Sequence, residues 1–177
     1  MYFEWSYPII DYFKTLKSNE KNTEIILPII MSLMISIIYF YFNLSNTALS
    51  HLRNILPATI SILIGFSMTS LTIIVTSNND SIKTLKDEYT DNRKIVSSVI
   101  TLYQWLIIMY IHAIISEIFL LIFIFFSAFL LQIGKIPYLA DVLLFIQISL
   151  LLHIFLVLLR NVANMYFIFY KKEDGCR

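Results

Sequence analysis

Four stretches of the sequence are long and apolar enough to cross a lipid bilayer, and this feature limits the fold more than any other. They cover residues 25–43, 55–77, 95–133 and 138–170, and a spanning helix needs about 20 mostly apolar residues. Hydrophobic residues make up 58% of the 177-residue chain and charged residues 14%, a balance typical of membrane proteins. The sequence therefore predicts an all-α integral membrane protein with four transmembrane helices.

The third and fourth stretches are longer than one crossing requires. As helices they would extend roughly 58 Å and 48 Å, whereas the hydrocarbon core of a bilayer is about 30 Å thick. Proline and glycine are absent between Asn92 and Gly134, so we expect one continuous helix there. The turn Gly134–Pro137 is then predicted to join the two long helices into a hairpin.

The distribution of Lys and Arg predicts how the chain is oriented. The N-terminal segment, the loop 78–94 and the C-terminal tail carry most of the cations, whereas the two alternating loops carry only Arg53 and Lys135. Because cytoplasmic loops are enriched in cations, we expect both termini in the cytoplasm and the chain in the inner (plasma) membrane of a cell. The cations that define this bias are Lys14, Lys17, Lys21, Lys83, Lys86, Arg93, Lys94, Lys171, Lys172 and Arg177.

With the Gly134–Pro137 turn outside, the surplus length of the hairpin would project into the cytoplasm as a helical stalk, at about residues 95–110 and 161–170. Its aromatic and amide side chains either pack on one another and on the N-terminal segment, or form a docking surface for a cytoplasmic effector protein. The candidate docking residues are Tyr103, Gln104, Trp105, Asn164, Tyr166 and Tyr170.

The segment 1–24 is expected to stand apart from the four-helix domain at 25–177. Between Pro8 and Lys17, apolar and charged residues alternate at helical spacing, which predicts a short amphipathic helix lying on the membrane surface. The loop 77–94 mixes acidic and basic residues and is expected to form a short solvated helix.

Small and hydroxyl-bearing residues recur at steps of three and four along the second span, so they share one helix face. Such a face lets helices approach closely, which predicts a homo-oligomer, with a tetramer as our guess. The alternative is that several copies of this face line a pore. The stripe consists of Ser61, Gly65, Thr69, Thr72 and Thr76.

Four ionisable residues fall within the two long helices, where charge is costly and often functional. His112 and Glu117 lie on the third helix, and His153 and Arg160 on the fourth. In an antiparallel hairpin, Glu117 would lie level with His153, and His112 with Arg160. We expect Glu117 to pair with His153 or Arg160, either as a contact that locks the hairpin or as a proton sensor.

The sequence offers little conventional catalytic chemistry. Its three glycines form no phosphate-binding loop, and its three histidines and single cysteine do not have metal-ligand spacing. No nucleophile motif is present, so we expect no enzyme activity, no catalytic residue, no metal and no cofactor. A net charge of +1 gives no reason to expect direct nucleic-acid binding.

The residues Gly65, Phe66 and Ser67, with the hydroxyl stripe around them, run into a polar segment and then a long third helix. This layout, over about residues 55–170, resembles small four-span membrane proteins of bacterial anti-phage systems. The membrane subunit of the Kiwa defence system is the nearest comparison, and the membrane accessory proteins of type VI-B CRISPR loci are a second. The resemblance to Kiwa implies a homo-oligomeric membrane sensor that recruits a cytoplasmic DNA-binding effector, with no catalytic residue. A pore that depolarises the membrane and a bacteriocin-immunity-like protein are the alternatives.

Overall fold

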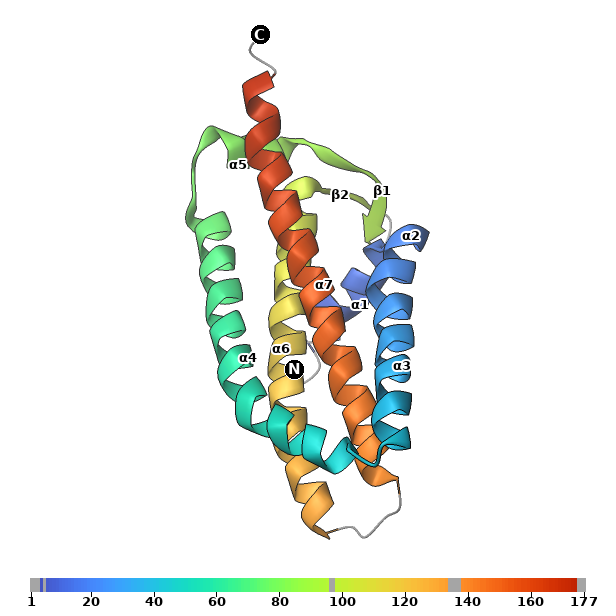
Figure 1. The fold of residues 1–177 in the computed structure, drawn as a ribbon. Coiled ribbons are helices and arrows are strands. Elements are labelled where there is room, and N and C mark those ends of the chain that lie inside the picture. The colour runs from blue at the N-terminus through green and yellow to red at the C-terminus, as the bar shows by residue number, and fades with distance from the viewer. Residues whose placement is uncertain (1–3, 5, 96–97, 134–137, 175–177) are drawn as a thin grey trace. The chain divides into compact units, whose positions relative to one another are not determined.

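The structure is a computed structural model that describes residues 4, 6–95, 98–133 and 138–174. Almost all of these residues are helical, and two short strands form the only sheet among them (Figure 1). The elements in chain order are α1 (Ser6–Thr15), α2 (Ser18–Lys21), the π-helical turn η1 (Asn22–Ile26), α3 (Leu27–Tyr41), α4 (Ser45–Thr76), α5 (Asp80–Asp87), β1 (Tyr89–Ile95), β2 (Ser98–Thr101), α6 (Leu102–Ile133) and α7 (Leu139–Asp174).

The prediction of four apolar spanning helices is confirmed. In the described part of the chain, four helical runs are long and apolar enough to cross a membrane: Ser18–Tyr41, Ser45–Thr76, Leu102–Gln132 and Leu139–Tyr166. The first run begins at Ser18 because α2, η1 and α3 are continuous, so the expected boundary at residue 24 falls inside a helix. The expected turn at 134–137 lies outside the described residues.

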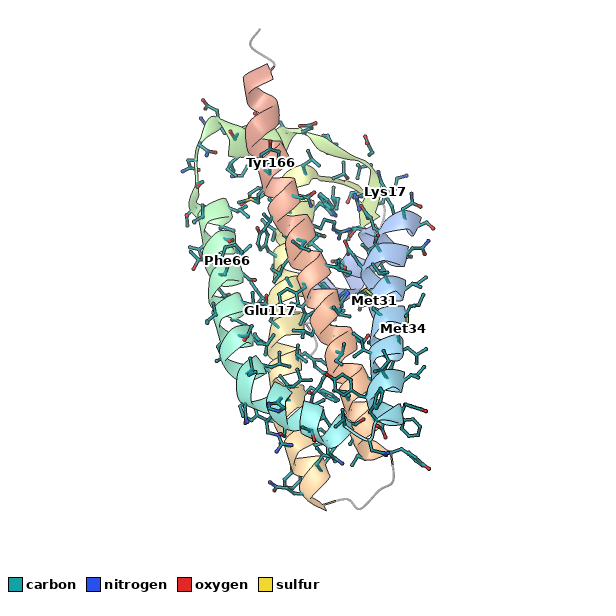
Figure 2. All side chains as sticks on the ribbon, viewed as in Figure 1. Lys17, Met31, Met34, Phe66, Glu117 and Tyr166 are labelled. Carbon is teal, nitrogen blue, oxygen red and sulfur yellow. The ribbon has the colours of Figure 1, made fainter. Side chains whose placement is uncertain are left out.

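The side chains of α6 are arranged as expected for a helix surrounded by lipid. Glu117 and Ser127 are buried, although a helix in water would expose a carboxylate and bury its phenylalanines. The exposed apolar side chains of this stretch are Ile118, Phe119, Ile122, Phe125, Phe126 and Phe129. Figure 2 labels Glu117 and three exposed apolar residues of other helices, Met31, Met34 and Phe66.

The chain divides into two compact units. Unit 1 comprises the described residues of 1–18, 66–114 and 157–177, and unit 2 comprises 19–65 and 115–156.

A β-hairpin precedes α6 in unit 1, which corrects the prediction of a helix from residue 95. Strands β1 and β2 pair antiparallel, with Tyr89 opposite Thr101, and the Thr90 hydroxyl donates to the carbonyl of Ile100 at 2.8 Å. The β-branched run Val99-Ile100-Thr101 favours a strand. The expected stalk segment 95–110 is therefore part strand and part helix.

A capping box fixes the start of α6. The Thr101 hydroxyl accepts from the backbone N–H of Gln104 at 3.2 Å, and the Gln104 side-chain oxygen accepts from the N–H of Thr101 at 3.0 Å. This reciprocal pair satisfies backbone donors that have no partner within the helix. The short helix expected in the loop is also present as α5, where the Asn79 side chain caps the N–H of Ile82 at 3.0 Å.

Unit 1 has its own apolar core, built from Ile74, Ile82, Leu85, Leu106 and Tyr110. The amphipathic N-terminal helix exists as α1, but it buries Tyr12 and Thr15 in this unit. That the rest of α1 rests on the membrane surface stays a prediction.

A Schellman motif joins α3 to α4 in unit 2. Asn43 adopts a positive φ of 54°, its N–H donates to the carbonyl of Phe40, and the N–H of Leu44 donates to that of Tyr39. Nearby, the Ser45 hydroxyl donates to the carboxylate of Asp141. The core at this point consists of Leu49, Leu143 and Leu144.

Candidate functional site

An aromatic ring joins two of the predicted ionisable residues in unit 1. The ring of Tyr12 stacks on His112 with 3.6 Å between centroids and 9° between planes, and the guanidinium carbon of Arg160 lies 5.9 Å from the same ring. Tyr12 is fully buried. His112 and Arg160 thus both lie against the ring of Tyr12.

Trp105 lies against two guanidinium groups. The Cζ atoms of Arg93 and Arg160 are 4.2 Å and 5.7 Å from its ring centroid, within range for cation–π attraction. Arg93 also donates to the carbonyl of Thr15 at 2.6 Å, which ties β1 to α1. A nitrogen of Arg160 lies 2.6 Å from the sulfur of Met109, which places α6 and α7 in register.

Three other side chains of unit 1 have buried polar atoms without hydrogen-bond partners in the described part of the chain. Asn161 is fully buried with neither Nδ2 nor Oδ1 paired, and the Nε1 of Trp105 and the Nδ2 of Asn164 are likewise unpaired. Leaving such a group buried and unpaired costs about 1–3 kcal/mol. We call Arg93, Trp105, Arg160, Asn161 and Asn164 the donor cluster, because nearly all of its polar atoms are hydrogen-bond donors.

In unit 2, His153 contacts the backbone of the first long helix. Its Nδ1 lies 2.6 Å from the carbonyl oxygen of Glu24, and since a carbonyl only accepts, this hydrogen bond requires a proton on Nδ1. In an α-helix that carbonyl would accept from residue 28, which is Pro28 and has no N–H. The local sequence therefore leaves an acceptor that His153 satisfies at the π-helical turn η1.

The expected partner of Glu117 stays a prediction. Its side chain is fully buried in unit 2, the unit that also contains His153. Also in unit 2, a buried hydrogen bond joins α6 and α7, where the Gln147 amide donates to the Ser127 hydroxyl at 2.7 Å.

The hydroxyl stripe faces outward. Ser61, Gly65, Thr69, Thr72 and Thr76 are all exposed. The hydroxyls of Ser61, Thr72 and Thr76 donate to carbonyls four residues earlier, at 2.7–2.8 Å. A Cβ added at Gly65 would meet nothing within 4 Å. Close packing within one chain therefore does not explain the stripe. Packing in a homo-oligomer and the lining of a pore both require further copies of the chain.

The six candidate docking residues differ in how far their side chains are exposed. Trp105 is only 9% exposed, so its side chain belongs to the interior and not to an exposed surface, which corrects the expectation for that residue. Tyr166 is 57% exposed. Gln104 is exposed and caps α6, while Tyr103 is half-buried beneath Lys86. Asn164 is half-buried, and the side chain of Tyr170 lies outside the described residues.

Sequence reasoning did not select Tyr12, Glu24 or Asn161 as site residues. Pro28, four residues after Glu24, is a signal that could have pointed to the Glu24 carbonyl, whereas no local pattern indicated that Tyr12 would reach His112. In the described part of the chain, no group of three or more His, Cys, Asp or Glu residues could hold a metal ion.

Comparison with family models, with curated proteins and with solved structures gave no match.

Proposed function

We propose that this chain is a non-enzymatic, oligomeric scaffold or sensor of the bacterial inner membrane, whose unit 1 docks a cytoplasmic effector protein. One observation carries the proposal. The described residues of 1–18, the loop after α4 and the end of α7 belong to one compact unit, and they carry most of the cations that the bias assigns to the cytoplasm.

The lengths of the last two helices support a structure that extends beyond the lipid. The 32 residues of α6 and the 36 residues of α7 correspond to about 48 Å and 54 Å, against about 30 Å of hydrocarbon. The surplus turns fall in unit 1 together with α5 and the β-hairpin. We infer that they form a folded cytoplasmic platform in place of the simple helical stalk.

Exposed aromatic residues of unit 1 are suitable anchors for a protein partner. Tyr89 of β1 is 67% exposed and Tyr166 of α7 is 57% exposed, and tyrosine is enriched in interface hot spots. The resemblance of the region around Gly65-Phe66-Ser67 to anti-phage membrane proteins supports defence as the setting and a DNA-binding protein as the effector.

Site-specific photo-crosslinking in cells tests the proposal. A photoreactive phenylalanine analogue at Tyr89 or Tyr166 should give an adduct with the same soluble protein. Tyr138, which is 67% exposed and belongs to unit 2, is the matched control and should give no such adduct. Tyr166→Ala should reduce recovery of that protein at least tenfold. Adducts at Tyr138 alone, or none at any position, would contradict the proposal.

A pore is the second candidate function, and the outward-facing hydroxyl stripe of α4 favours it. Rings of Ser and Thr from several copies could hold water. Planar-bilayer recordings of the reconstituted oligomer decide between the two functions, because a scaffold should stay silent under all conditions, whereas a pore should conduct.

A further inference from the structure

We propose that the donor cluster of unit 1 binds a phosphate group, carried by a phospholipid headgroup or by free phosphate. Three side chains contribute N–H groups without partners among the described residues: the Asn161 and Asn164 amides and the Trp105 indole. Two guanidinium groups lie on the same indole. An environment made mostly of donors suits a ligand made mostly of acceptors, and a phosphate has several acceptor oxygens.

The register of α6 and α7 places these donors at one level. Arg160 contacts Met109. One turn before Met109 on α6 is Trp105, and one turn after Arg160 on the antiparallel α7 is Asn164, so Trp105 and Asn164 lie level with each other. Asn161, next to Arg160, lies just under one helical turn before Asn164. The indole contacts with both arginines agree with this register.

The chemistry of the cluster favours phosphate over a single carboxylate. Three neutral N–H donors beside two guanidinium groups suit a tetrahedral group with several acceptor oxygens better than a carboxylate with two. The Asn161 Oδ1 atom, a buried acceptor without a partner in the described residues, would take a hydroxyl of a glycerol headgroup or of a protonated phosphate. Basic pockets between membrane helices on the cytoplasmic side commonly hold lipid headgroups.

Burial determines which experiment is suitable. Because Asn161 is fully buried and Trp105 is 9% exposed, a bound lipid should exchange slowly and survive extraction. We expect native mass spectrometry of the chain in a phosphate-free maltoside detergent to find about one phospholipid per chain. In the lipid-depleted protein, phosphatidylglycerol should raise the melting temperature, whereas diacylglycerol, which lacks the phosphate, should not.

Two variants and a matched control identify the site. Asn161→Leu and Trp105→Phe should each weaken phosphatidylglycerol binding about tenfold or more, and the phenylalanine retains the ring on which the arginines lie. Gln147→Leu makes the same amide-to-leucine change at a buried position of unit 2 and should leave binding unchanged.

The arms of the experiment distinguish the two sources of phosphate. If inorganic phosphate stabilises the lipid-depleted protein as well as phosphatidylglycerol does, and the same variants abolish the effect, the ligand is a free phosphate. If neither probe binds and Asn161→Leu raises the melting temperature, the unpaired amides hold water or nothing, and the proposal is wrong.

Discussion

The contact between His153 and the Glu24 carbonyl yields a prediction that depends on the backbone N–H that Pro28 lacks. The acceptor is buried, with Glu24 4% exposed, and the donor Nδ1 is 2.6 Å away. Replacing His153 by Leu keeps most of the apolar volume but removes the donor. In an α-helix the N–H of residue 28 would donate to the Glu24 carbonyl, but Pro28 has no N–H. His153 takes its place, so the leucine variant removes that hydrogen bond.

The expected cost follows from the burial of that acceptor. Leaving a buried carbonyl without its partner costs about 1–3 kcal/mol, while measured hydrogen bonds between membrane helices average about 0.6 and reach about 1.7 kcal/mol. We expect His153→Leu to reduce the free energy of unfolding by about 1–2 kcal/mol. In a Pro28→Ala background the new N–H of residue 28 can satisfy the carbonyl, so the cost should fall to about half.

Reversible unfolding by dodecyl sulfate in mixed micelles, followed by tryptophan fluorescence, measures these differences. His51→Leu, at an exposed histidine of α4 in the same unit, is the control and should change the free energy of unfolding by under about 0.5 kcal/mol. If His153→Leu lowers the free energy of unfolding equally with Pro28 in place and in the Pro28→Ala background, within about 0.3 kcal/mol, then His153 does not substitute for the N–H that Pro28 lacks.

Two further predictions concern the folding of unit 1. Thr101→Ala removes one half of the capping box and should cost about 1 kcal/mol, measured in the same unfolding assay, whereas an unchanged free energy would show that the box is not formed. Leu85→Ala, at a 3% exposed position of α5, should cost about 2–4 kcal/mol. Lys83→Ala, which breaks only an exposed 3.4 Å pair with Asp80, should cost at most about 0.5 kcal/mol, and a similar loss for both variants would contradict the assigned core.

The sequence predicts the long helices because hydropathy and length are local properties. It also contained the true start of α6, since Thr101 and Gln104 have capping-box spacing and the residues before them are β-branched. Apolar content alone predicted a helix from residue 95, because a short apolar run fits a strand and a helix equally well. Capping and branching signals distinguish these structures where hydropathy does not.

The contacts of the candidate site could not be predicted in the same way. Tyr12 against His112, and Arg93 against the Thr15 carbonyl, join segments far apart in the sequence, and their pairing depends on how α1 and the β-hairpin fold back. Pro28 identified a carbonyl in need of a donor but not which residue would supply it. A local pattern can therefore indicate that a group needs a partner, whereas only the tertiary structure identifies that partner.

The polarity of the other helices makes the stripe on α4 an exception that a second copy would explain. Ser32 of α3, Glu117 of α6 and Gln147 of α7 are all buried, as expected where polar groups hold helices together in lipid. Gly65, in the middle of the stripe, faces outward with nothing within 4 Å of an added Cβ.

Gly65→Leu therefore separates the fold of one chain from its assembly. Within one chain the larger side chain has room, and replacing a glycine in a helix should raise the stability by up to about 1 kcal/mol. Between copies packed through this face the same side chain would force the helices apart, so the oligomer should dissociate. Native mass spectrometry after gentle extraction reports the number of subunits, with Ile62→Ala, at a 73% exposed position of the same helix, as the control. A Gly65→Leu chain that keeps the full subunit number would show that the stripe lies outside the interface, because no packed helix pair could accept leucine there without moving.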